Sequence, residues 1–160
     1  MGAGLSKNRI KGLSASVDQN SAVLILGTLP GRMSLTYGKY YADPSNKFWD
    51  ILFIACGEKI DKTDQGKKQL LEKYHIALWD ILYSAVRKTS NDKDISDETP
   101  NNLPLFLSQY PNIKLATVYK GNIIKNLIMD CQSYTKYRPN ETTGGIFVSW
   151  RRKEELPTGA

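Results

Sequence analysis

The stretch AVLILGTLPG, residues 22–31, decides the fold. Its first five residues are apolar, a short run that is typical of a strand buried on both faces of a parallel sheet. The turn that follows begins at Gly27 and ends at Gly31, so it lies at the carboxyl end of the predicted strand. Ligands bind at this edge of open α/β sheets. The two glycines allow the backbone to approach a ligand closely, and Pro30 stiffens the bend.

Strand and helix patterns alternate along the rest of the chain, and a polar, turn-rich segment at residues 90–102 is expected to be an exposed loop. Strands joined by helices imply right-handed crossovers. The predicted fold class is therefore α/β, a three-layer α/β/α sandwich with a central four-stranded parallel sheet. Beyond the first strand, the patterns predict strands at 75–78, 113–119 and 145–150 and helices at 46–56, 65–74, 103–110 and 121–129.

The length of 160 residues suits a single domain, with residues 1–18 as a flexible N-terminal tail and 151–160 as an atypical C-terminal tail. A formal net charge of +6 favours a polyanionic partner, although many ordinary proteins carry such a charge. Cys56 and Cys131 lack metal-binding spacing, so we expect no metal, no cofactor and a reduced cytoplasmic setting. No apolar run reaches the roughly 18 residues of a membrane span. Nothing in the sequence demands more than a monomer.

A second segment, YYADPSNKFW at residues 40–49, follows the glycine turn and contains Asn46. The asparagine carboxamide both accepts and donates hydrogen bonds, so it can orient a water molecule and bond a nucleobase. Tyr41 offers a ring on which an extruded base can stack. Adjacent side chains of an extended segment face opposite ways, so we expect one of Tyr40 and Tyr41 to point inward and the other toward the ligand. Together the turn and this segment indicate a nucleobase pocket.

The run from residue 26 to 52 resembles the uracil-DNA glycosylase superfamily, and most closely its hypoxanthine (deoxyinosine) DNA glycosylase branch. The resemblance rests on GTLPG at 27–31, SL at 34–35, YYA at 40–42, Pro44, Asn46 and FW at 48–49, and it continues in LWDIL at 78–82 and YKGN at 119–122. It implies a monofunctional DNA glycosylase of base excision repair, a hydrolase that cleaves the N-glycosidic bond of a deaminated base. The implied substrate is DNA containing deoxyinosine, from which hypoxanthine is released.

The resemblance assigns the main catalytic role to Asn46. The superfamily's strongest uracil enzymes have an acidic residue in the first turn, where this chain has Thr28 and Leu29, so we expect inefficient uracil removal. The base is expected to contact Tyr41 and the backbone of Gly27, Thr28 and Leu29. The residues expected at DNA phosphates are Gly31, Arg32, Ser34, Lys120 and Asn122.

Alternatives remain open for several of these positions. Asn46 is also well suited to cap the following helix, and Asp80, at the end of the second strand, to cap whatever follows it.

Superfamily members usually end in a Leu-Pro-Ser type loop that enters the minor groove, whereas only residues 156–158 resemble it here. Three rival functions are therefore a non-catalytic nucleic-acid or nucleotide-binding module with a glycosylase fold, a weak uracil or mismatch-specific glycosylase, and an enzyme of free nucleotides.

Overall fold

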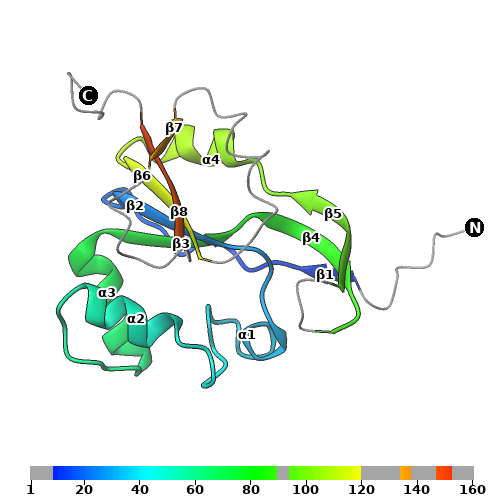
Figure 1. Ribbon diagram of the computed structural model, residues 1–160, viewed down its shortest axis with the longest axis horizontal. Helices are drawn as coiled ribbons and strands as arrows, with labels where there is room; N and C mark the ends of the chain where they lie inside the picture. The colour runs from blue at the N-terminus through cyan, green and yellow to red at the C-terminus, as the bar shows by residue number, and fades with distance from the viewer. Residues whose placement is uncertain (1–8, 90–93, 120–133, 138–146, 153–160) are drawn as a thin grey trace, which may run out of the picture.

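The computed structural model describes residues 9–89, 94–119, 134–137 and 147–152 (Figure 1). These residues form two sheets and four helices. The elements are β1 (Arg9–Lys11), β2 (Val23–Gly27), α1 (Arg32–Tyr37), α2 (Phe48–Ala55), α3 (Asp64–Tyr74), β3 (Ile76–Asp80), β4 (Leu82–Arg87), β5 (Ile95–Pro100), α4 (Leu103–Gln109), β6 (Leu115–Tyr119), β7 (Tyr134–Tyr137) and β8 (Phe147–Arg152).

The larger sheet has five strands in the order β3-β2-β6-β8-β7. Strands β2, β3 and β6 run parallel, which confirms the strands predicted at 22–26, 75–78 and 113–119. The predicted fourth strand occurs as β8, but β8 runs antiparallel to both β6 and β7. The expected four-stranded parallel sheet is thus a mixed sheet with three parallel strands. An apolar strand pattern gives no strand direction, and the helix predicted at 121–129 lies outside the described residues.

Helices cover both faces of this sheet, as a three-layer α/β/α arrangement requires (Figure 1). Side chains of β2 alternate between the faces because successive residues of a strand point opposite ways. Leu24 and Leu26 belong to a buried cluster that includes residues of α4. Ile25 belongs to a second cluster, formed with residues of α2 and α3. On the α4 side, the Trp79 ring stacks on Phe106 with the ring centroids 4.4 Å apart.

The helices predicted at 46–56, 65–74 and 103–110 are confirmed as α2, α3 and α4. Gly57 lies just beyond α2 and has a φ of +68°, a conformation that favours glycine. Thr63 caps α3, because its side chain accepts a hydrogen bond from the Gly66 amide at 3.0 Å. Asn102 caps α4 in the same way, by accepting from the Leu105 amide at 3.1 Å.

The second sheet, with strand order β1-β4-β5, was not predicted. Residues 9–11 pair with β4, and Ser16 forms a bridge to Leu78, so these parts of the expected 1–18 tail belong to the fold. The predicted loop at 90–102 contains β5, whose residues are almost all exposed. Backbone pairing with β4, rather than burial, holds β5 in place, which is why no hydrophobic pattern marks it. The expected 151–160 tail likewise begins with the last two residues of β8.

Strand β3 leads almost directly into β4, so Asp80 ends a strand and caps no helix, contrary to expectation. Two backbone amides at the junction of β3 and β4 donate hydrogen bonds to the glycine turn. Ile81 N donates to the Gly27 carbonyl at 2.8 Å, and Leu82 N donates to the Thr28 carbonyl at 3.1 Å. These bonds join the turn to both sheets. Within the described residues, no helix is long and apolar enough to cross a membrane.

Candidate functional site

The parallel strands β2, β3 and β6 end at Gly27, Asp80 and Tyr119, which lie at the same edge of the sheet. A cavity of about 870 Å³ opens there between the glycine turn and the segment 40–47. This volume lies within the usual range for small-molecule pockets and exceeds what a single nucleobase needs. Of the ten predicted site residues, the following line the cavity: Leu29, Gly31, Arg32, Ser34, Tyr41 and Asn46.

Gly27 and Thr28 do not line the cavity. Thr28 is only 5% exposed, so the structure does not bring its side chain to the ligand space. A Cβ atom at Gly27 would lie 2.6 Å from Asp80 Oδ1 and 3.0 Å from the Tyr41 hydroxyl. A side chain at this position would therefore displace at least one of these two cavity side chains. At Gly31 an added Cβ would meet nothing within 4 Å, which leaves that part of the turn open.

Arg87, at the end of β4, forms hydrogen bonds to the glycine turn. Its side chain is 4% exposed, and its guanidinium donates to the Leu29 carbonyl at 3.4 Å and to the Pro30 carbonyl. The two bonds fix the peptide planes on which the turn's amides depend. Our sequence analysis missed Arg87 because it did not predict β4, although the alternation in LYSAVR at 82–87 is a usable strand signal.

Replacing Arg87 with methionine should destabilise the fold by about 1–3 kcal/mol, because two carbonyls lose their buried donors. Urea denaturation followed by circular dichroism measures the change. Lys88→Met is the matched control, since Lys88 is the exposed neighbour and surface substitutions usually stay within about 0.5 kcal/mol. Equal unfolding midpoints for the two variants would mean that the guanidinium does not support the turn.

Tyr41 forms an aromatic wall of the cavity. Its ring is stacked on Phe48 with centroids 3.7 Å apart and meets Tyr119 edge-on at 5.6 Å. The Tyr41 backbone has a φ of +51°, an uncommon conformation for a bulky residue, which often marks a functional site. Tyr40 is anchored differently, because its hydroxyl donates to the Ser14 carbonyl at 2.9 Å. Its ring still borders the same cavity.

Burial raises the pKa of the Tyr40 hydroxyl, and the negative charge of Asp80 raises it further. Burial also raises the pKa of Tyr119. Both hydroxyls therefore remain protonated at neutral pH and can act as neutral donors.

The loop that carries Asn46 is ordered by local polar contacts. Asp43 Oδ1 accepts from the Ser45 amide at 2.9 Å and from its hydroxyl at 2.8 Å, and these bonds lower the pKa of Asp43. The Asn46 amide donates to the Asp43 carbonyl, and Asn46 Oδ1 accepts from the Phe48 amide at 2.9 Å. Asn46 thus supports the start of α2, although Lys47 is the N-cap residue itself.

The position of Asn46 is compatible with both roles considered for it. Its Oδ1 contact with the Phe48 amide fixes the plane of the carboxamide at the cavity wall. An asparagine oxygen has two lone pairs and its nitrogen carries two protons, so one contact leaves capacity for a ligand. Support of the helix and binding in the cavity are compatible.

Ser34 and Arg32 belong to α1, which the sequence analysis did not predict. Ser34 is 7% exposed, and its hydroxyl accepts from the Ala42 amide at 3.2 Å, which ties α1 to the segment carrying Tyr41. Arg32 is exposed at the cavity rim, where a guanidinium can reach a phosphate. The predicted phosphate contacts Lys120 and Asn122 lie outside the described residues.

Asp80 is the most buried charged group of the cavity wall, with 4% of its surface exposed. It pairs in register with Gly27, and its carbonyl accepts from Asn101 Nδ2 at 2.7 Å. Its place after the second strand was visible in the sequence, but a helix cap was the simpler interpretation. Among the described residues, the cavity is also lined by the charged side chains of Asp43, Arg32 and Lys47.

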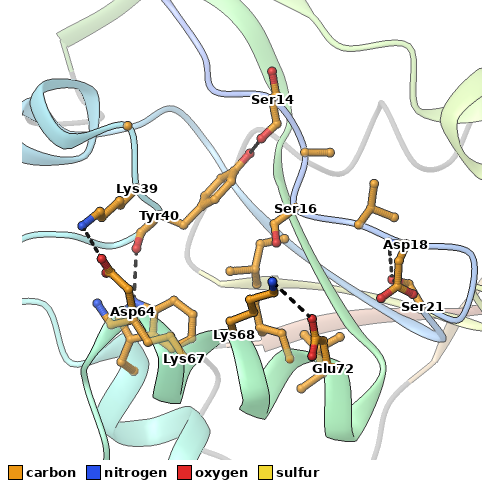
Figure 2. Close-up of a pocket in the computed structure, with 17 residues that line it drawn as sticks. Ser14, Ser16, Asp18, Ser21, Lys39, Tyr40, Asp64, Lys67, Lys68 and Glu72 are labelled. Carbon is orange, nitrogen blue, oxygen red and sulfur yellow. Dashed lines mark hydrogen bonds and ion pairs between the residues drawn. The ribbon is translucent and has the colours of Figure 1, made fainter.

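A second cavity of about 500 Å³ lies between residues 14–21 and α3 (Figure 2). Its charged residues are largely paired: Lys39 bonds Asp64 at 2.7 Å, and Lys68 lies 3.9 Å from Glu72. None of the predicted site residues that the structure describes lines this cavity. The cavity at the strand ends is therefore the candidate site. No cluster of three or more His, Cys, Asp or Glu side chains suited to a metal ion occurs among the described residues.

Comparisons with known proteins match this chain to a family of DNA glycosylases. The sequence profile of the Uracil DNA glycosylase superfamily matches residues 15–152. A hypoxanthine DNA glycosylase from Methanosarcina acetivorans is 34% identical over 148 residues, which cover 91% of this chain and 94% of the relative. Another, from Methanosarcina barkeri, is 34% identical over 106 residues, covering 66% and 67%. A solution NMR structure from Methanosarcina acetivorans, named as a candidate uracil DNA glycosylase, gives a TM-score of 0.60 at 33% identity and covers 68% of each chain.

Proposed function

This chain belongs to the uracil DNA glycosylase superfamily and is a DNA glycosylase, and we propose that it releases hypoxanthine from deoxyinosine in DNA. The observation that carries this proposal is the cavity at the ends of the parallel strands, where Asn46 and Tyr41 come together. Two relatives at 34% identity carry the name hypoxanthine DNA glycosylase. The first turn also lacks the acidic residue associated with efficient uracil removal.

In the proposed reaction an extruded base enters the cavity and is held by stacking and hydrogen bonds. Tyr41 provides the aromatic surface, itself supported by Phe48 and Tyr119. Asn46 bonds the base with its NH₂ group and orients water with its oxygen. The departing purine gains negative charge, so donors around Leu29 stabilise the transition state more than the bound substrate.

We propose that DNA is held mainly through its phosphates at the rim of the cavity. Arg32 lies there exposed, and the open space at Gly31 allows a backbone amide to be approached. Ser34, Lys120 and Asn122 complete the proposed set. Such contacts position the duplex without reading its sequence. They also suit a chain with a net charge of +6.

The enzyme is further proposed to act as a single-domain cytoplasmic monomer that needs no cofactor.

The test compares matched duplexes that contain one deoxyinosine or one deoxyuridine. Each is incubated with excess enzyme and cleaved with alkali at abasic sites. We expect release from deoxyinosine at least about tenfold faster than from deoxyuridine, equivalent to a transition-state difference of about 1.4 kcal/mol. Faster release from deoxyuridine would identify a uracil-specific enzyme instead.

The same experiment separates the two remaining rivals. A non-catalytic binding module would bind both duplexes with a strong salt dependence and release no base. An enzyme of free nucleotides would release hypoxanthine from the free nucleoside deoxyinosine as fast as from DNA. The proposed glycosylase should act poorly on the nucleoside, because phosphate contacts position its substrate.

A further inference from the structure

We propose that Asp80 is a second catalytic residue of this site, the carboxylate that receives a proton from the attacking water. The inference rests on the proposed function and extends it to a residue that the superfamily motif in the first turn does not supply. Its basis is the placement of Asp80 by β3, its burial, and the charges around it. Asn46 alone cannot perform this step, because a carboxamide is not a proton acceptor at neutral pH.

The pairing of β3 with β2 places the Asp80 carboxylate beside the glycine turn. Gly27 and Asp80 are paired residues on neighbouring parallel strands, both at the carboxyl end of the sheet. Asp80 Oδ1 approaches the Gly27 backbone so closely that a Cβ there would lie 2.6 Å away. A carboxylate that is absent from residues 28–29 thus enters the site from the adjacent strand. The Tyr41 hydroxyl would lie 3.0 Å from the same Cβ, so the Asp80 carboxylate and the Tyr41 side chain approach the same part of the turn.

The backbone around Asp80 is fixed on both sides, which keeps the carboxylate in place. Its carbonyl accepts from Asn101 Nδ2 at 2.7 Å, and the next amide, of Ile81, donates to the Gly27 carbonyl at 2.8 Å. With 4% of its surface exposed, Asp80 nevertheless lines the cavity that contains Asn46. A buried carboxyl at the wall of a ligand cavity is a typical arrangement for acid–base catalysis.

In the proposed step, the oxygen of a water molecule bonds to C1′ of deoxyribose as the C1′–N9 bond breaks. The electron pair of that bond leaves with the purine, while the proton lost by water passes to Asp80. Asp80 then returns this proton to the departing base or to solvent, so the products are hypoxanthine and an abasic sugar. A carboxylate also stabilises the positive charge that develops on the sugar. No other reactant is required.

Three other ionisable groups of the described cavity lining have shifted pKa values. Tyr40 and Tyr119 have a raised pKa, so they stay protonated as the pH falls. The pKa of Asp43 is lowered by its bonds to Ser45. The other charged residues of the described lining are Arg32 and Lys47, which are basic. Comparison of the wild type with Asp80→Asn therefore decides whether a loss of rate on acidification comes from Asp80.

The test measures single-turnover release of hypoxanthine from the deoxyinosine duplex between pH 4.5 and pH 8, for the wild type and for Asp80→Asn. The asparagine variant keeps the side-chain shape but cannot accept the proton. We expect it to be about 100-fold slower at neutral pH, as is typical for loss of a general base. The wild-type rate should fall as the pH is lowered, because protonation removes the acceptor, and the variant should lose this acid limb. Binding of the duplex should persist.

Asp97→Asn serves as the matched control, since Asp97 is an exposed aspartate of β5. It should keep the wild-type rate and pH profile. If Asp80→Asn does not fold, the pH dependence of the wild-type rate is compared with that of Asp80→Glu. The glutamate variant keeps a carboxylate, so its rate should also fall as the pH is lowered. A wild-type rate independent of pH, or an asparagine variant as fast as the wild type, would overturn the role of Asp80 alone. Wild-type enzyme that releases no base from either duplex would overturn the proposed function as well.

Discussion

Asn46→Ala is expected to slow hypoxanthine release about 1,000-fold, the upper end of the effect of removing one polar group that stabilises a transition state. The variant loses both the NH₂ donor for the base and the oxygen that orients water. Single-turnover release from a deoxyinosine duplex measures the effect. Asn112→Ala is the control, because Asn112 bonds the Gln19 carbonyl at an exposed position and does not line the cavity.

Loss of helix support must be separated from loss of catalysis, because Asn46 Oδ1 also accepts from the Phe48 amide. Removing such a contact costs roughly 0.5–2 kcal/mol of stability. Asn46→Asp keeps the acceptor oxygen, so it should keep the stability of the wild type and still lose most of the activity. An aspartate variant with full activity would contradict a role for the NH₂ group, and an alanine variant with full activity would leave Asn46 as a helix-supporting residue only.

Gly27→Ala should reduce the rate of base release more than 100-fold, the loss that a misplacement of about 1 Å can cause. The new methyl group would lie 2.6 Å from Asp80 Oδ1 and 3.0 Å from the Tyr41 hydroxyl, so at least one of these groups must move. Overpacking of this kind typically costs about 1–3 kcal/mol of stability. Single-turnover kinetics and urea denaturation measure the two effects.

Gly31→Ala provides the comparison for stability, because a Cβ at Gly31 meets nothing within 4 Å. Its unfolding midpoint should match that of the wild type. If Gly27→Ala also unfolds at the wild-type midpoint and releases base at the wild-type rate, then Asp80 and Tyr41 are not held against the Gly27 backbone as described.

The sequence was sufficient to predict the elements whose hydrophobic pattern is strong. The apolar run at 22–26 occurs as the central parallel strand, and the segments at 46–56 and 103–110 contain helices. The cavity lies where the predicted turn placed it, because the end of a buried parallel strand in an α/β sheet opens onto ligand space. Local rules were thus enough to predict where the candidate cavity lies.

Features that depend on pairing between distant residues were not predictable in this way. Strand β5 is held by the backbone of β4 and carries an exposed polar sequence, so it resembles a loop. The direction of β8 is likewise set by its neighbours. Asp80 reaches the glycine turn because β3 pairs with β2, and Arg87 reaches it because β3 continues into β4. Their contacts connect residues more than fifty positions apart along the chain.

The most direct test of the account is to identify the base that the wild-type protein releases from duplex DNA containing a single deoxyinosine. The released material is separated from the DNA and analysed by mass spectrometry, with Asn46→Ala in parallel. We predict free hypoxanthine in an amount equal to the abasic sites formed, and about 1,000-fold slower release by the variant. Bound duplex that yields no free base, or release that is unchanged by Asn46→Ala, would contradict the assignment of this cavity as a hypoxanthine glycosylase site.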